Sequence, residues 1–216
     1  KKFANTNPKL KMIAIVIPTW HRIEFTEICL KSFIKYTNFD IVTKVKVFDN
    51  NSGVEMKDLL ESLDVDYEVG EFNGAWAGFN KFLGEVNNDK SIKYIGKVDN
   101  DVYFTKPWIE PIIDEFNKDE TIGSIRYGWS NSKGKTSPFT KNRGFNGGLK
   151  IIKKQLAIPI LEDQRYTGSN GISNNVINQG FTTSSMEVGV HMLDLLYPDL
   201  ESKYKGMGIQ RPNTGS

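Results

Sequence analysis

Residues 94–101 have the sequence YIGKVDND, a short apolar run that stops at Asp99, Asn100 and Asp101. The run has the length and composition of a buried strand. Asp and Asn are common turn formers, so an isolated Asp-x-Asp is more typical of a solvated turn. Directly after an apolar strand, two carboxylates two positions apart can instead reach one hard cation and a diphosphate bound to it. This position favours the interpretation as a cation site.

Strand and helix patterns alternate on both sides of this segment, along the first 120 residues. Strands are predicted at 11–18 (KMIAIVIP), 43–48, 65–69 and 94–98, and helices at 23–36, 54–62, 76–86 and 107–117. Pro111 falls near the first turn of the last of these helices, where proline is tolerated. Such alternation predicts an α/β fold with a mostly parallel, doubly wound sheet flanked by helices.

Polar clusters follow three of these strands, at residues 19–22, 49–51 and 99–101. Ligands of open parallel sheets bind outside the carboxyl ends of the strands. We therefore expect the three clusters to form one shared rim that binds a ligand.

Each polar group at this rim has a chemical and a structural interpretation. Asp49 can accept a hydrogen bond from a base N–H or simply shape the turn. Trp20 can stack on a base or pack on the next helix, and Arg22 can meet a phosphate or face water. His191, after a predicted strand, can complete a metal site with Asp101 or be structural.

The second half of the chain has a different character. Strands are predicted at 122–126, 147–152 and 181–190, a helix start at 153–157 and a helix at 168–178. Residues 130–144 are rich in Gly, Ser, Lys and Asn and are expected to form a loop that closes over a ligand. We expect one domain over 1–216, with halves at about 11–120 and 121–193 and a polar tail at 194–216 that drapes over it.

Composition excludes several classes of protein. With 38% hydrophobic and 25% charged residues in 216, the chain is neither disordered nor a membrane protein. The single cysteine, Cys29, lies in an apolar run and is expected in the core. With no visible signal peptide or membrane span, a reducing cytoplasm is expected. A net charge of +2 is too small to indicate nucleic-acid binding by itself.

Six segments together resemble the family-two glycosyltransferases. The segment 17–22 (IPTWHR) is similar to the family's Pro-Thr-Tyr-Asn-Arg opening, with Trp20 and His21 replacing tyrosine and asparagine. The others are 47–52 (VFDNNS), 73–80 (NGAWAGFN, with Ala75 for a usual glycine), 98–101 (VDND), 145–149 (FNGGL) and 187–191 (EVGVH). The resemblance covers about residues 12–191.

This resemblance implies a GT-A fold, a Rossmann-like sheet with a smaller mixed sheet on the acceptor side. It also implies a nucleoside-diphosphate sugar donor, with uridine preferred, and Mn²⁺ or Mg²⁺ as cofactor. The implied donor-site residues are Pro18, Thr19, Trp20, Arg22, Asp49, Asn73, Ala77, Asn80, Asp99 and Asn100. The implied metal ligands are Asp101, Asp99 and His191.

One departure from the family concerns the general base. Inverting members carry a Glu-Asp pair ahead of a helix that ends in Gly-aromatic, whereas residues 168–171 (GSNG) lack carboxylates here. Asp163 is the first candidate base and Glu162 the second. A non-catalytic nucleotide-sugar-binding or carbohydrate-binding module is therefore an alternative, as is a nucleotidyltransferase of similar fold. The acceptor is left open among glycans, lipid-linked sugars, proteins and modified nucleic acids.

Overall fold

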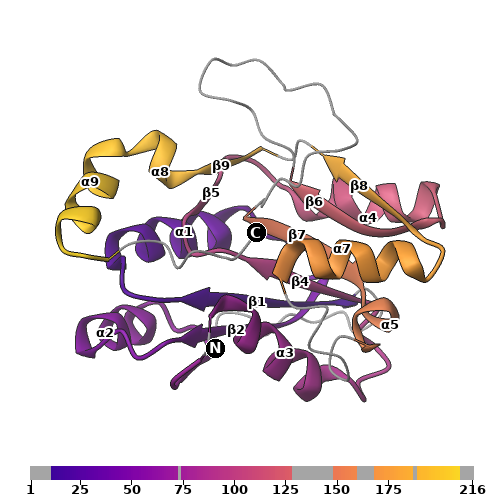
Figure 1. Ribbon diagram of the computed structural model, residues 1–216, viewed down its shortest axis with the longest axis horizontal. Coiled ribbons are helices and arrows are strands. Elements are labelled where there is room, and N and C mark those ends of the chain that lie inside the picture. The colour runs from indigo at the N-terminus through magenta and orange to yellow at the C-terminus, as the bar shows by residue number, and fades with distance from the viewer. Residues whose placement is uncertain (1–10, 73, 128–147, 160–167, 187–188, 210–216) are drawn as a thin grey trace.

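The computed structural model of the chain describes residues 11–72, 74–127, 148–159, 168–186 and 189–209. Its main sheet has seven strands in the order β3-β2-β1-β4-β7-β6-β8 (Figure 1). These strands are β1 (Ile13–Thr19), β2 (Val42–Asp49), β3 (Tyr67–Val69), β4 (Tyr94–Val98), β6 (Ile122–Tyr127), β7 (Leu149–Lys153) and β8 (Thr182–Met186). A separate two-stranded sheet pairs β5 (Val102–Phe104) with β9 (Val190–Met192).

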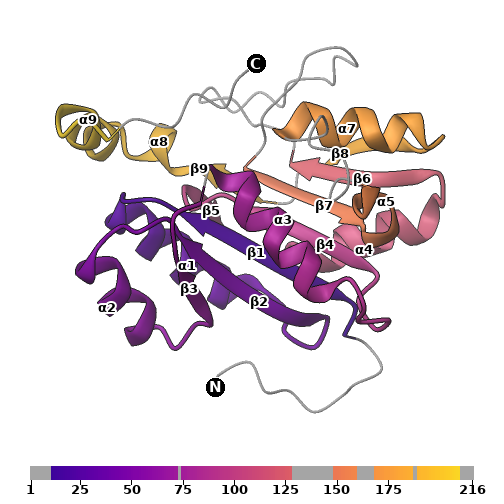
Figure 2. The ribbon, with the colours of Figure 1, turned by 60° about the horizontal axis from the view of Figure 1, so that its bottom comes forward.

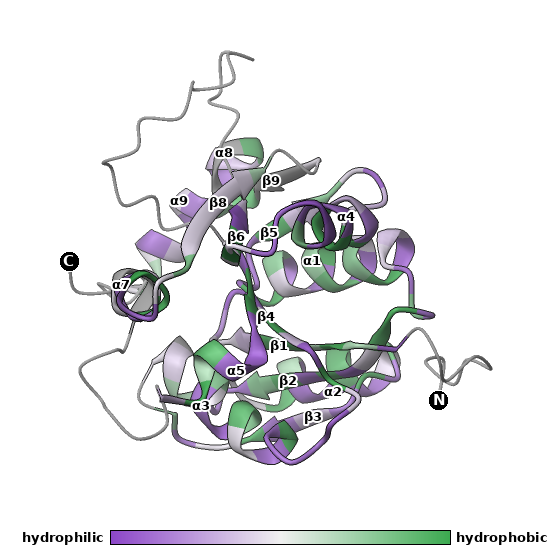
Figure 3. Cartoon of the chain, turned by 90° about the vertical axis from the view of Figure 1, so that its right-hand side faces the viewer, coloured by the Kyte–Doolittle hydropathy of each residue, from purple (hydrophilic) through white to green (hydrophobic). Residues whose placement is uncertain are grey.

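Helices cover both faces of the main sheet (Figures 2 and 3). One face carries α1 (Ile23–Tyr36), α2 (Val54–Ser62) and α4 (Ile109–Lys118), and the other carries α3 (Ala75–Val86), α5 (Lys154–Ala157) and α7 (Gly168–Asn178). Alternate residues of β1 enter the two cores, which explains its unbroken apolar sequence: Ile13, Ile15 and Ile17 on one side, Ala14 and Val16 on the other.

The predicted parallel arrangement is confirmed for the first half of the chain. β1 pairs in parallel with β2 and with β4, and β2 with β3. β7 then enters antiparallel between β4 and β6, and β8 continues in parallel with β6. The sheet is therefore mixed and mostly parallel. The strands β6, β7 and β8 extend the sheet and do not form a new layer.

Most predicted elements appear within a few residues of their expected bounds, including α7, which matches its prediction. The predicted strand 181–190 is wrong, because its residues belong to β8 and β9 in different sheets. Gly189, just before β9, has φ +70°, a backbone conformation that an extended strand does not contain. The predicted loop 130–144 lies outside the described residues. No helix in the part of the chain that the structure describes is long and apolar enough to span a bilayer.

The tail is helical where the structure describes it. α8 (Leu193–Leu196) leads into α9 (Pro198–Gly206), and Tyr204 of α9 is buried in the core beside α1. Pro198 begins α9, Asp199 and Glu201 lie in its first turn, and Lys203 and Lys205 in its last. Proline is tolerated at the start of a helix, and acidic residues in the first turn and basic residues in the last turn interact favourably with the helix macrodipole. As expected, Cys29 on α1 is fully buried.

Candidate functional site

The carboxyl ends of β1, β2 and β4 lie at one edge of the sheet because these strands are parallel neighbours. Thr19 and Asp49 are register partners at the last position of β1 and β2. Direct bonds connect the loops that follow these strands, so the three predicted clusters form one continuous polar edge. We call this edge, residues 19–22, 49–52 and 99–101, the rim.

Asp49 lies at the base of the rim and is 1% exposed. The Thr19 hydroxyl donates to its Oδ1 at 3.0 Å, and the Ser52 N–H donates to its Oδ2 at 3.0 Å. The Ser52 hydroxyl bonds to Oδ1 as well. Asp49 therefore shapes the turn after β2, as the structural interpretation predicts. Its carboxylate is also held in a fixed orientation at the strand end.

The loop after β1 has an unusual backbone. His21 and Arg22 both have positive φ, at 48° and 50°, a region that non-glycine residues rarely adopt. The His21 N–H donates to the Ser52 hydroxyl at 2.7 Å, which ties this loop to the turn after β2. The Trp20 ring lies 5.0 Å from the His21 ring. The tight turn directs the Arg22 side chain back across the rim.

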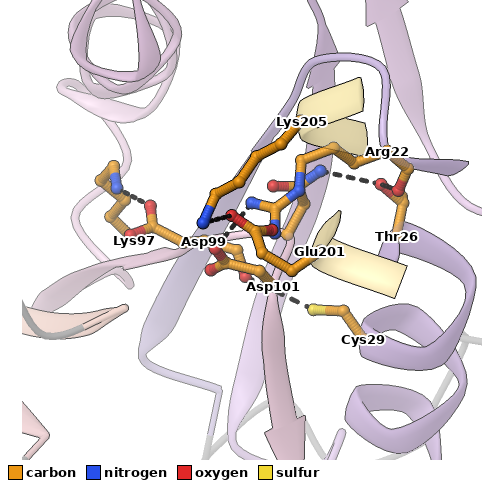
Figure 4. A network of polar contacts seen from close by, with 9 residues as sticks. Arg22, Thr26, Cys29, Lys97, Asp99, Asp101, Glu201 and Lys205 are labelled. Atoms are coloured by element: carbon orange, nitrogen blue, oxygen red, sulfur yellow. Dashed lines mark hydrogen bonds and ion pairs between the residues drawn. The ribbon is translucent and has the colours of Figure 1, made fainter. Parts of the chain in front are cut away.

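The turn after β4 contacts the same loop and helix α1 (Figure 4). Arg22 Nη1 donates to Asp101 Oδ2 at 3.0 Å, and the Asn100 amide donates to the Thr26 hydroxyl at 2.9 Å. Asp99 pairs with Lys97, two residues earlier. The Asp99 side chain is 34% exposed, whereas Asp101 is buried with Arg22. Asp99 is thus the more accessible carboxylate of this turn.

Helix α9 brings a carboxylate, that of Glu201, to the rim. Sequence patterns did not indicate this contact. Glu201 accepts a hydrogen bond from Arg22 Nη2 at 2.6 Å, so Arg22 bridges Asp101 and Glu201. Lys205 lies 3.6 Å from the other oxygen of Glu201. In the sequence, the proline and the acidic residues of the first turn are consistent with the start of a helix at α9. Nothing in the sequence shows where that helix docks.

Helix α3 supplies two of the predicted donor-site positions, Ala77 and Asn80. It begins at Ala75, and the Ala77 N–H donates to Gly74 at 3.1 Å. A Cβ at Gly78 would lie 3.1 Å from Phe48, so glycine there lets α3 pack closely on β2. The Asn80 Oδ1 is buried and has no hydrogen-bond partner among the described residues.

Of the other predicted metal and catalytic residues, His191 alone lies in the part of the chain that the structure describes. Asn73, Glu162 and Asp163 lie outside the described residues. His191 pairs with Tyr103 in the β5–β9 sheet, and the next residue but one, Leu193, donates its N–H to the Asp101 carbonyl at 2.7 Å. The chain thus brings β9 alongside the turn that holds Asp101.

The carboxylate oxygens of Asp99 and Asp101 are of the type that small hard cations prefer. Within the described ranges, no three His, Cys, Asp or Glu side chains gather closely enough to bind a metal on their own. Mg²⁺ and Mn²⁺ are commonly bound by one or two carboxylates together with waters and substrate phosphates. The accessible carboxylate of Asp99 beside Asp101 fits such a site, which a bound diphosphate would complete.

The sequence profile of glycosyl transferase family 2 matches residues 14–170, which include the whole rim. The chain belongs to this family of glycosyltransferases. A search among curated proteins finds no significant match. The matched region ends just after the start of α7, so β8, β9 and the helical tail lie beyond it.

Solved structures of the same fold include transferases of two kinds. A mannosyltransferase from Pyrobaculum calidifontis, in complex with GDP-Man and Mn²⁺, has TM-score 0.60 and 14% identity over 85% of this chain. The chain spans 57% of that protein's length. A glucosyl-3-phosphoglycerate synthase from Mycobacterium tuberculosis, in complex with Mn²⁺, UDP and phosphoglyceric acid, has TM-score 0.59 and 12% identity, with coverage of 95% and 81%. A 4-diphosphocytidyl-2C-methyl-D-erythritol synthase from Anaerococcus prevotii has TM-score 0.58 and 12% identity, with coverage of 89% and 99%. These likenesses establish a GT-A fold.

Proposed function

We propose that this family member transfers a hexosyl or pentosyl group from a nucleoside-diphosphate sugar, preferably a UDP-sugar, to an acceptor hydroxyl with inversion. The observation that carries the proposal is the rim, where a fixed carboxylate at β2 and an accessible carboxylate at β4 flank β1 on one edge of the sheet. A nucleotide lying across β1 would have its base near Asp49 and its diphosphate near Asp99.

Relatives of the same fold support this choice of donor. The mannosyltransferase was solved with GDP-Man and Mn²⁺, and the glucosyl-3-phosphoglycerate synthase with UDP and Mn²⁺. Both carry a nucleoside diphosphate and a divalent cation, which are the two ligands that the rim's carboxylates suit. Mn²⁺ is therefore the first cofactor to test, and Mg²⁺ the second.

The residues of the chain have distinct tasks in this scheme. Asp49 and Thr19 hold the base end of the donor, and Trp20 offers a ring for packing. Asp101, Asp99 and, as predicted from the family, His191 would hold the cation. When bound, the cation would neutralise the diphosphate leaving group as a Lewis acid.

The acceptor hydroxyl attacks the anomeric carbon, and the bond from that carbon to the diphosphate oxygen breaks. A general base removes the hydroxyl proton. Asp163 and then Glu162 stay the predicted bases. A cytoplasmic location also stays a prediction from the sequence.

Two other functions share the fold. The cytidylyl-transferring synthase of similar structure favours a nucleotidyltransferase as the second candidate. The sequence argues against a nucleotidyltransferase, because the loop at residues 19–22 (TWHR) lacks the glycines that usually bind the phosphates of a nucleoside triphosphate. A nucleotide-sugar-binding module without catalysis is the third candidate, suggested by the missing carboxylates at residues 168–171.

A binding experiment tests whether the protein has a donor site for a nucleoside diphosphate. The melting temperature would be measured with UDP, GDP, CDP and ADP, each with and without Mn²⁺, because a ligand that binds the native state stabilises it. We expect one diphosphate, most readily UDP, to raise the melting temperature only with Mn²⁺. A lack of response to every nucleotide would contradict the proposal.

Variants then test the assignment of the carboxylates. Asp99→Asn and Asp101→Asn should abolish the Mn²⁺-dependent shift, whereas Asp114→Asn on the exposed side of α4 should retain it. Release of UDP from a UDP-sugar only in the presence of an acceptor would identify a transferase. Release of inorganic pyrophosphate from UTP and a sugar phosphate would identify a nucleotidyltransferase instead.

A further inference from the structure

A single guanidinium at the rim is shared by two carboxylates from distant parts of the chain (Figure 4). Arg22 Nη1 donates to Asp101 Oδ2 at 3.0 Å, and Arg22 Nη2 donates to Glu201 Oε2 at 2.6 Å. The Arg22 and Asp101 side chains are buried, and the Glu201 side chain is only 15% exposed. Ion pairs withdrawn from water are screened less than exposed ones, so a change in one of these pairs should affect the other.

The two bonds divide the donors of Arg22. An arginine that faces one carboxylate commonly gives it two parallel N–H···O bonds. Here the two terminal nitrogens bond to different carboxylates, one to Asp101 and one to Glu201. The Nε of Arg22 is buried and has no hydrogen-bond partner among the described residues. Without Glu201, Arg22 would therefore have donors with which to strengthen its bond to Asp101.

Glu201 is held in place by contacts of α9 that do not involve Asp101. Tyr204, one turn further along α9, is buried beside α1 and bonds through its hydroxyl to Glu24. Lys205 lies 3.6 Å from the second oxygen of Glu201 and is itself exposed. The Glu201 carboxylate thus belongs to a helix that is docked separately, and its bond to Arg22 does not depend on the turn after β4.

Arg22 is also restrained from its own side. It precedes α1 with φ 50°, and its guanidinium lies 4.2 Å from the centre of the Phe25 ring. A cation above an aromatic face is attracted to the ring. Phe25 below and Glu201 beside it therefore fix the guanidinium, so that Nη1 is the nitrogen directed at Asp101.

This arrangement links Glu201 to any cation that binds Asp101. Such a cation competes with Arg22 for the Asp101 carboxylate, and Glu201 competes with Asp101 for Arg22. A group that weakens the bond between Arg22 and Asp101 therefore lowers the free-energy cost of binding a cation at Asp101. The coupling is reciprocal, so a cation bound at Asp101 should in turn strengthen the pair of Arg22 with Glu201.

We propose that Glu201 is a positioning residue for the divalent cation of the donor site. It holds one end of Arg22 and so lessens the hold of Arg22 on Asp101. This inference rests on the proposed function, in which Asp101 is a ligand of the cation. Glu201 lies beyond residues 14–170, the part of the chain that the family profile matches. Helix α9 would thus add a control of cation affinity to the rim that the family provides.

The test is Mn²⁺ binding in the presence of saturating UDP, with free Mn²⁺ measured by electron paramagnetic resonance. The proteins are the wild type, Glu201→Met, Glu201→Gln and the control Asp199→Met. Asp199 is an exposed carboxylate in the first turn of the same helix, so the control removes the same charge from α9. We expect the dissociation constant for Mn²⁺ to rise about tenfold in Glu201→Met, the size of effect expected for one charged hydrogen bond.

The two other variants separate position from charge. Glu201→Gln keeps an oxygen that can accept from Arg22 Nη2, so it should bind Mn²⁺ nearly as the wild type does, and Asp199→Met should be unchanged. Equal losses in Glu201→Gln and Glu201→Met would assign the effect to charge alone and overturn the proposal. Urea unfolding of the same proteins measures stability separately. A Glu201→Met variant that loses stability but keeps its Mn²⁺ affinity would show a structural role only.

Two further outcomes are decisive. A wild type that binds UDP and Mn²⁺, with all variants alike, would overturn this inference and leave the proposed function standing. A wild type that binds no Mn²⁺ with UDP would overturn the proposed function and this inference with it. If Glu201→Met does not fold, Glu201→Asp decides, because it keeps the charge on a side chain one methylene shorter. Its Mn²⁺ affinity should fall, and an unchanged affinity would contradict the proposal.

Discussion

Arg22 and Asp101 form an ion pair of 3.0 Å whose side chains are both 6% exposed. The pair joins the loop after β1 to the turn after β4, and these two segments are 79 residues apart in the chain. Arg22 also bonds to Glu201 at the far end of the sequence. One guanidinium therefore holds together two segments of the rim and helix α9.

Replacing Arg22 by Met should destabilise the protein strongly. The substitution leaves the Asp101 carboxylate buried without its cation, and breaking such a pair costs about 3–5 kcal/mol. Urea unfolding at neutral pH measures the change in free energy. Lys31→Met, which breaks the exposed pair with Glu27, should cost less than about 0.5 kcal/mol. Similar effects for both variants would show that the buried pair has no special role.

Tyr204 should anchor the helical tail to the rest of the fold. Its ring is 4% exposed and lies 5.7 Å from the Phe25 ring, and its hydroxyl bonds to Glu24 at the start of α1. Truncating a large buried side chain leaves a cavity, so Tyr204→Ala should cost about 3 kcal/mol. Tyr197, which is 44% exposed, provides the matched control. Equal losses for Tyr204→Ala and Tyr197→Ala in thermal unfolding would contradict this role.

Gly123 and Gly84 should respond in opposite directions to alanine. A Cβ at Gly123 would lie 2.6 Å from Leu156 and 2.7 Å from Val176, so Gly123→Ala should destabilise by about 1–3 kcal/mol through overpacking. A Cβ at Gly84 of α3 meets nothing within 4 Å, so Gly84→Ala should stabilise the helix by about 0.5–1 kcal/mol. Chemical denaturation of both variants measures the two signs. A stabilising Gly123→Ala would mean that β6 and α7 are not packed this closely.

Stability should depend on pH through Lys150. Its pKa is lowered to about 7 in the folded protein from 10.5, by burial first and then by Arg126 and Lys97. Between these two values the unfolded chain binds a proton that the folded protein does not, so stability rises with pH across that window. Lys150→Met removes this dependence. Its advantage over the wild type should be greatest near pH 6, on the order of 1–3 kcal/mol, and should shrink towards pH 10.

The measurement is urea unfolding of both proteins between pH 6 and pH 10. A constant difference across this range would show that Lys150 keeps its ordinary pKa.

The sequence predicted the strands of the first half well because the apolar run of β1 and the alternation of β2 are local signals. It also predicted that polar groups would gather at the strand ends, since parallel strands necessarily share a carboxyl edge. It failed at residues 181–190, where a periodic pattern cannot show that the chain changes sheets between β8 and β9. The helix α9 was missed because its short polar sequence resembles a surface tail.

The fold class, the family and the polar residues that follow β1, β2 and β4 can be recognised without coordinates of the fold. These depend on local patterns and on short motifs, which are visible without coordinates. The pairing of Arg22 with both Asp101 and Glu201, and the alignment of Lys97, Lys150 and Arg126 across three strands, are visible only in the folded chain. Such contacts depend on strand register and on the docking of distant elements, which arise from the packing of the whole chain.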